Sequence, residues 1–268
     1  MPDAAPSAYA SSLLAPDEPP PVVVERAEGG SPLVLVADHA GRRFPRATGT
    51  LGLAPDELER HIAYDIGIAP VAREVARALD APLVAQTYSR LVIDCNRPTH
   101  VPSSIPEVSE TTEIPGNRDL PATARAARIE ALFRPYHDAI AAILDARARR
   151  GQPTALIAMH SFTPVYMGAS RPWQLGLLYN RDARLARRVL DLLARDGTLT
   201  VGDNLPYKVD DQTDYTLPVH GEQRGLPHLG LEIRQDLIAE AAGQEHWTPR
   251  VEQLLRQLLA ELPAAREG

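Results

Sequence analysis

The chain has 268 residues, enough to bury a substantial core as one large α/β domain or at most two smaller ones. Its formal net charge of −7 argues against a general nucleic-acid-binding protein, which usually carries a basic excess. The single cysteine, Cys95, excludes an intramolecular disulfide and is typical of a reducing compartment. The sequence has neither a signal-peptide pattern nor an apolar stretch of about 20 residues. We therefore expect a cytoplasmic protein with no membrane or nucleic-acid partner.

Apolar strands and Ala/Arg/Leu-rich helices alternate along most of the chain. Residues 1–21, rich in Pro, Ala and Ser, predict a flexible N-terminal arm or a strap on the surface, ahead of a single domain over 22–268. Strands are expected near 33–37, 83–87, 91–94, 155–159, 175–179 and 229–233, and helices near 55–80, 121–149, 182–195 and 248–261. The alternation predicts a three-layer αβα architecture around a mostly parallel mixed sheet. The long loops 98–121 and 202–227 are expected to be functional or disordered.

Three of the predicted strands carry a polar side chain of a kind that binds zinc or works with it. His160 ends one apolar run, His39 follows another, and Glu232 lies inside a third. Because carboxyl ends of parallel strands meet at the edge where open α/β sheets bind ligands, these side chains are expected to converge. The alternative interpretations are structural: His39 alone fits a structural histidine, and Glu232 could form a salt bridge with Arg234 on the same strand face.

A second group of polar residues surrounds the predicted strand 91–94. Arg90 and Arg97 bracket this strand, and Asn96 adds an amide beside the second guanidinium. A planar guanidinium matches a carboxylate in bidentate fashion, so the group is a candidate clamp for an acidic substrate. Asp94 is expected to orient one of the arginines. A surface cluster of salt bridges is the alternative.

Asp65 lies inside a helical pattern with isoleucines around it. It is either a carboxylate on the helix surface or one that is turned inward toward a site.

Together these residues resemble the N-formylglutamate amidohydrolase family from about Val34 to Leu237. The matching segments, in order, are Asp38-His39-Ala40-Gly41, Phe44-Pro45, Asp65, Tyr88-Ser89-Arg90, Ile93-Asp94-Cys95-Asn96-Arg97-Pro98, Tyr136-His137, His160-Ser161, His220 and Leu231-Glu232. The family is similar to the zinc carboxypeptidase and aspartoacylase type of hydrolase, which implies a zinc-exopeptidase-like fold. The resemblance implies that His39 and His160 hold zinc, that Glu232 activates water, and that Asn96 with Arg97 takes the substrate carboxylate.

The sequence departs from the carboxypeptidase pattern at Arg42, which stands where those relatives have a glutamate ligand. A third ligand must then come from elsewhere, and we expect Asp65, with Asp38 in reserve. Two histidines, one carboxylate and an open position form a typical catalytic zinc set. Cys95 replaces a more usual aliphatic residue and is expected to be a packing residue.

The resemblance implies zinc-dependent hydrolysis of the amide of an N-formyl or N-acyl acidic amino acid, such as N-formylglutamate, by a monomer or homodimer. His220 or Arg90 is expected to donate a hydrogen bond to the oxyanion, and Arg171 to help fix a carboxylate. His137 is expected to support the site without binding metal. The other histidines, expected to be structural or on the surface, are His61, His100, His228 and His246. The alternatives are a zinc hydrolase of another N-acyl amino acid or short peptide, and a non-catalytic protein that binds a small acid.

Overall fold

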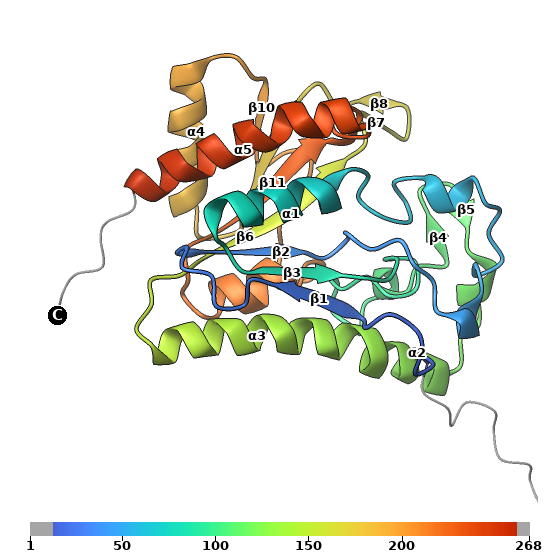
Figure 1. Cartoon of the computed structure of the whole chain (residues 1–268). Helices are drawn as coiled ribbons and strands as arrows, with labels where there is room; N and C mark the ends of the chain where they lie inside the picture. The colour runs from blue at the N-terminus through green and yellow to red at the C-terminus, as the bar shows by residue number, and fades with distance from the viewer. Residues whose placement is uncertain (1–12, 262–268) are drawn as a thin grey trace, which may run out of the picture.

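The computed structural model describes residues 13–261, and a seven-stranded sheet lies at its centre (Figure 1). The strand order is β1-β3-β2-β6-β11-β9-β10. The strands are β1 (Val22–Glu25), β2 (Leu33–Ala37), β3 (Leu83–Gln86), β6 (Ala155–Phe162), β9 (Leu175–Leu178), β10 (Val201–Asp203) and β11 (His228–Arg234). Strands β3, β2, β6 and β11 run parallel, whereas β1 is antiparallel to β3 and β9 is antiparallel to β11. The mostly parallel mixed sheet is therefore confirmed.

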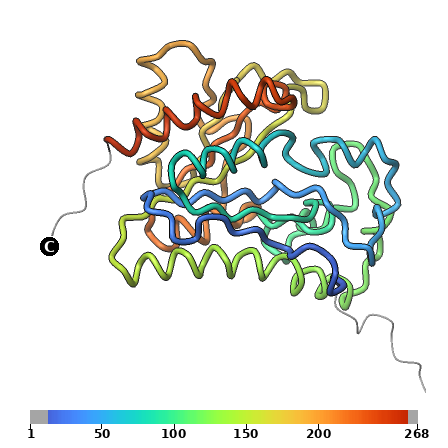
Figure 2. The backbone as a smooth tube through the Cα atoms, viewed as in Figure 1, coloured from blue at the N-terminus to red at the C-terminus, as the bar shows by residue number. Residues whose placement is uncertain are grey.

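Helices cover both faces of this sheet, which confirms the three-layer architecture (Figure 1). One face is covered by α1 (Ile68–Leu79), α4 (Arg184–Asp196) and α5 (Ala241–Glu261). The other is covered by α2 (Ala122–Arg128) and α3 (Arg134–Arg149), which are joined by a π-helical segment, Ile129–Phe133. The backbone trace in Figure 2 shows α3 and α5 on opposite sides of the strands.

The central strands are apolar throughout because both of their faces are buried. In β2, Leu33 and Leu35 point to the α1 side, whereas Val34 and Val36 point to the α3 side. All four are 0% exposed. Burying such a side chain stabilises the fold by about 1.5–3 kcal/mol, so these runs fix which segments become central strands.

One expected strand is wrong, and one expected helix is wrong in part. Residues 91–94 form no strand; they lie in a turn and the irregular segment after it, and their apolar side chains pack into the α3-side core. The expected helix over 55–80 begins only at Ile68, because Gly67 has a φ of +78° that a right-handed helix cannot contain. Strands β1 and β10 were not expected. Two hairpins lie outside the main sheet, β4 (Val108–Ser109) with β5 (Thr112–Glu113) and β7 (Val165–Tyr166) with β8 (Ala169–Ser170).

The described part of the N-terminal segment lies along the surface as a strap. Leu13 packs against the α3-side core, and the Tyr88 hydroxyl donates a hydrogen bond of 2.8 Å to the Pro19 carbonyl. The rest of the predicted arm, residues 1–12, lies outside the described residues. Among the helices within 13–261, none has the length and apolar composition needed to cross a membrane.

Candidate active site

The candidate site lies at the carboxyl edge of the parallel strands, as predicted. His39 is the second residue after β2, while His160 in β6 and Glu232 in β11 are register partners on neighbouring strands. All three side chains are at most 6% exposed. On β11, Leu231 packs into the α1-side core while Glu232 points to the site. The alternation of a strand therefore delivers the carboxylate to the polar edge.

Asp65 reaches the same place from the turn that precedes α1, not from within a helix. Its backbone N–H donates to the His39 carbonyl at 2.9 Å, and its carboxylate accepts from the Ser161 backbone N–H at 3.2 Å. Gly67 lets this turn approach the chain closely, because a Cβ there would lie 2.0 Å from the Ile238 carbonyl oxygen. The turn is thus held against both β2 and β6.

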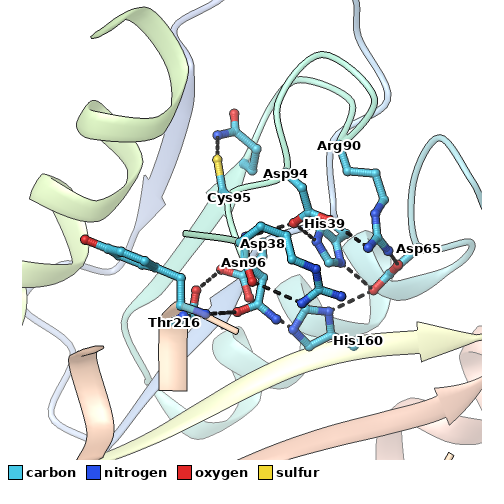
Figure 3. Close-up of polar contacts among 12 residues, drawn as sticks. Asp38, His39, Asp65, Arg90, Asp94, Cys95, Asn96, His160 and Thr216 are labelled. Carbon is cyan, nitrogen blue, oxygen red and sulfur yellow. Dashed lines mark hydrogen bonds and ion pairs between the residues drawn. The ribbon is translucent and has the colours of Figure 1, made fainter. Parts of the chain in front are cut away.

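His39, Asp65 and His160 form a compact cluster (Figure 3). Asp65 Oδ2 lies 2.9 Å from His160 Nδ1 and 3.5 Å from His39 Nδ1. One potential ligand atom from each of the three residues lies within 4.8 Å of the others. These are the side chains through which the site could hold a metal ion.

The other nitrogen of each imidazole ring faces a second carboxylate. Asp94 Oδ1 lies 2.7 Å from His39 Nε2, and Asp38 Oδ2 lies 3.1 Å from His160 Nε2. The Thr216 hydroxyl donates to Asp38 Oδ1 at 2.6 Å and fixes that carboxylate. Asp38, the reserve ligand, therefore faces the far side of the His160 ring. Carboxylates in this position orient metal-binding histidines and raise their basicity.

The charge of the cluster suits a divalent cation. Three buried carboxylates, those of Asp38, Asp65 and Asp94, contact the two histidines, and the Arg90 guanidinium pairs with two of them, Asp65 and Asp94. Burial lowers the pKa of His160, but hydrogen bonds with Asp38 and Asp65 outweigh it and raise that pKa well above its usual value. Carboxylates that attract a proton to this point also attract a metal cation. His39 Nδ1 is buried without a hydrogen-bond partner among residues 13–261, as an available ligand atom would be.

Glu232 also has a buried polar atom, Oε2, without a hydrogen-bond partner among the described residues. Burial raises the pKa of this carboxyl to about 7. The alternative salt bridge with Arg234 is wrong, because Arg234 lies 2.8 Å from Asp236. Glu232 can therefore hold or release a proton near neutral pH.

The arginines near the site are held by carboxylates. Arg90 lies 2.7 Å from Asp94, as expected for an arginine that Asp94 orients, and it lines the cavity. Arg97 Nη1 lies 2.9 Å from Asp214 and also donates to the Thr213 carbonyl.

Asn96 also lines the cavity, and it anchors a neighbouring loop. Its Oδ1 accepts from the Thr216 and Tyr215 backbone N–H groups at 3.0 and 3.2 Å, and its Nδ2 lies 3.3 Å from Asp214. Because the amide already makes these contacts, it fixes the position of the loop 213–216.

Two expected site residues do not line the cavity. The Arg171 guanidinium lies 4.6 Å from the Tyr166 ring centroid and 4.7 Å from that of Tyr207, and it donates to the Tyr207 hydroxyl. Arg171 thus holds two tyrosines that do line the cavity.

His220 is the other expected residue outside the cavity lining. Its ring stacks on that of His137, and burial lowers the pKa of His220 to about 3, so the imidazole is neutral.

The cavity has a volume of about 340 Å³ and includes residues that sequence reasoning missed. The expected residues in its wall are His39, Asp65, Arg90, Asn96, Arg97, His160 and Glu232. The missed ones include His61, Glu110, Tyr166, Tyr207, Lys208 and Asp214. Most of them come from hairpins or from the loop 202–227. The length of this loop was the one feature of the sequence that indicated a functional role for it. His61, expected to be structural or on the surface, lies 3.5 Å from Glu110.

Three further residues lie away from the ligand atoms. The Cys95 sulfur points away from the cluster (Figure 3) and accepts a hydrogen bond from Gln86 at 3.0 Å. Arg42 is exposed and pairs with Glu59. Gly41 packs closely against the protein backbone, since a Cβ there would lie 2.2 Å from the Thr87 carbonyl carbon.

Fold and site together define a three-layer α/β protein with a buried His-Asp-His cluster in a cavity at the sheet edge. The model of the family described as N-formylglutamate amidohydrolase matches residues 31–239. The chain belongs to this family and is accordingly a hydrolase that acts on amide bonds.

Two solved structures are similar to the whole fold. The gene product Atu2144 from Agrobacterium tumefaciens is 39% identical with a TM-score of 0.89, over 93% of this chain and 99% of that chain. The N-formylglutamate amidohydrolase from Ralstonia eutropha JMP134 is 22% identical with a TM-score of 0.66, over 90% and 97% of the two chains. The similarity to the Ralstonia eutropha structure supports the fold of this chain. No curated protein matches the sequence.

Proposed function

We propose that the protein hydrolyses the amide bond of an N-formyl or other N-acyl acidic amino acid, such as N-formylglutamate, with one zinc ion. His39, Asp65 and His160 would hold the ion, because one potential ligand atom from each lies within 4.8 Å of the others and the surrounding carboxylates favour a divalent cation. When bound there, zinc would polarise the amide oxygen and lower the pKa of water. The observation that carries the proposal is the buried carboxyl of Glu232 beside this cluster, in a chain of the amidohydrolase family.

Glu232 is the proposed general base. A carboxyl with a pKa of about 7 can accept a proton from the attacking water and transfer it to the leaving amine at neutral pH. Arg90 is the proposed donor to the oxyanion, since its guanidinium lines the cavity and lies 3.5 Å from Asp65. His220 is a weaker candidate for this role, because it is neutral and lies outside the cavity lining.

Asn96 and Arg97 are the proposed contacts of the α-carboxylate. Both line the cavity, and Arg97 makes its hydrogen bonds to the described residues through Nη1, which leaves Nε and Nη2 for a ligand. Arg171 would act on the substrate through the tyrosines that it holds.

The reaction is tested by incubating the purified protein with N-formylglutamate, N-acetylglutamate and a glutamyl dipeptide. Release of free amine and of formate, acetate or amino acid is measured before chelation, after chelation and after zinc is restored. We expect formate and glutamate in equal amounts, loss of activity on chelation and recovery with zinc. Unchanged turnover after removal of all metal would contradict the mechanism, and exclusive turnover of another compound would reassign the substrate.

We propose a cytoplasmic location on the basis of cysteine content. A single buried cysteine fits a reducing compartment such as the cytoplasm. We propose a small-molecule substrate as the partner and a monomer or homodimer as the assembly.

A further inference from the structure

The cavity wall contains three Lys or Arg side chains among the described residues, and two of them are already paired. Arg90 lies 2.7 Å from Asp94, and Arg97 lies 2.9 Å from Asp214. The third is Lys208, which makes no hydrogen bond or ion pair with any residue in the described range 13–261. Among the Lys and Arg side chains of the described cavity wall, its ammonium group is therefore the one whose charge is not already matched by a carboxylate.

The other charges of the cavity make a free cation necessary for an acidic ligand. The carboxylates in the cavity wall are those of Asp65, Glu110, Asp214 and Glu232. A second carboxylate brought in by a substrate would meet this negative field inside a partly enclosed space. The charges of Arg90 and Arg97 are already matched by Asp94 and Asp214, so Lys208 supplies the charge that can balance a second substrate carboxylate.

Lys208 lies at the outer part of the site. Its side chain is exposed, whereas His39 and Asp65 are each 4% exposed. In an N-acyl acidic amino acid the α-carboxylate is close to the amide, and the side-chain carboxylate is farther away. If the amide lies at the buried cluster, the distal carboxylate extends toward the rim.

The loop that carries Lys208 is anchored to the site. Arg97 donates to the Thr213 carbonyl at 2.8 Å, and Asn96 accepts from the backbone N–H groups of Tyr215 and Thr216. These contacts fix the loop between β10 and the helical segment Leu217–Glu222 at the cavity wall.

We propose that Lys208 binds the side-chain carboxylate of the substrate and gives the enzyme its preference for acidic N-acyl amino acids. The inference rests on the proposed function for the identity of the substrate, but the anion site itself rests on the free ammonium group. Lys208 would be a specificity-determining residue that takes no part in the hydrolytic step.

The kinetic test compares N-formylglutamate with N-formylglutamine, which has nearly the same shape but a neutral side chain. We expect Lys208→Met to lower kcat/KM for N-formylglutamate about 10- to 100-fold, mainly through KM, as the loss of one charge-assisted hydrogen bond predicts. Turnover of N-formylglutamine should be unchanged, and Lys208→Arg should restore most of the preference. Arg149→Met is the matched control, because it removes an exposed charge outside the cavity wall. Equal losses on both compounds, or no loss, would overturn the proposal.

A binding test separates this inference from the proposed reaction. Lys208 is the one lysine among the chain's 28 Lys and Arg residues, so amine acetylation can be followed by mass spectrometry at a single side chain. In the Glu232→Gln protein, N-formylglutamate should slow acetylation of Lys208 and N-formylglutamine should not. Shielding of Lys208 without any hydrolysis by the unmodified enzyme would support the anion site and contradict the proposed reaction. Hydrolysis without shielding would support the reaction and contradict the anion site.

Discussion

The Asp94 carboxylate lies 2.7 Å from His39 Nε2, and this contact leaves Nδ1 of the same ring for the cluster with Asp65. Asp94 thereby fixes both the orientation of the ring and the nitrogen that is available to a metal. We expect Asp94→Asn to weaken zinc binding about 10- to 100-fold, measured by competition with a chromogenic chelator. Asp80→Asn is the control, because Asp80 pairs with Arg26 on the surface. Equal zinc affinity in both variants would contradict this role.

His160 and His220 form a matched pair for locating the metal. Both are buried, but His160 lies in the cluster with Asp65, whereas His220 stacks on His137. We expect His160→Ala to lose the metal, because two ligands cannot replace a set of three, and His220→Ala to keep it. Elemental analysis of the purified proteins measures the stoichiometry directly. Full zinc occupancy in His160→Ala would remove this residue from the ligand set.

Glu232 is expected to be needed for turnover and not for metal binding. The Glu232→Gln change keeps the shape of the side chain but removes the proton acceptor, so the rate should fall about 10²- to 10⁴-fold while zinc is retained. Glu222→Gln is the control: Glu222 is also largely buried, but it lies outside the cavity lining, 3.4 Å from His228. Activity and metal content of both variants are measured together. Normal turnover in Glu232→Gln would exclude it as the base.

The strand-borne part of the site could be predicted from sequence because strand periodicity is local. The apolar run of β6 ends in His160, and the alternation of β11 separates Leu231 from Glu232. Once the strands are parallel neighbours, their side chains must meet at one edge. Asp65 was harder, because its position depends on a glycine turn held against Ile238, far along the chain.

The loop-borne part of the site could not be predicted in the same way. Residues 91–94 have the composition of a strand, yet their backbone forms hydrogen bonds outside the sheet; Asp94 N–H, for example, donates to the carbonyl of Ser104 in a short 3-10 helix. Lys208 and Asp214 lie in a loop without periodicity, so no local pattern indicates that they face the cavity. The contact of Asp38 with His160 likewise depends on long-range packing.

Cys95 is expected to be chemically inert in the folded enzyme. Burial raises the pKa of its thiol well above the usual value, so the reactive thiolate is scarce at neutral pH. Ellman's reagent should react slowly with the native protein and release one equivalent per chain on unfolding, since Cys95 is the only cysteine. Cys95→Ala should keep its turnover. Rapid native labelling, or loss of activity in that variant, would assign the thiol a catalytic role.

Gly67 connects the stability of the fold to the position of Asp65. Gly67 and Gly151 both have positive φ values, +78° and +63°, so an alanine at either position should cost about 1–2 kcal/mol in free energy of unfolding. At Gly67 the new Cβ would also lie 2.0 Å from the Ile238 carbonyl oxygen, whereas at Gly151 nothing lies within 4 Å. We therefore expect Gly67→Ala to cost a further 1–3 kcal/mol or so from overpacking, and to weaken zinc binding by displacing Asp65. Denaturant titration and zinc competition on the two variants measure both effects. If they lose equal stability and bind zinc equally well, the close approach to Ile238 does not position Asp65.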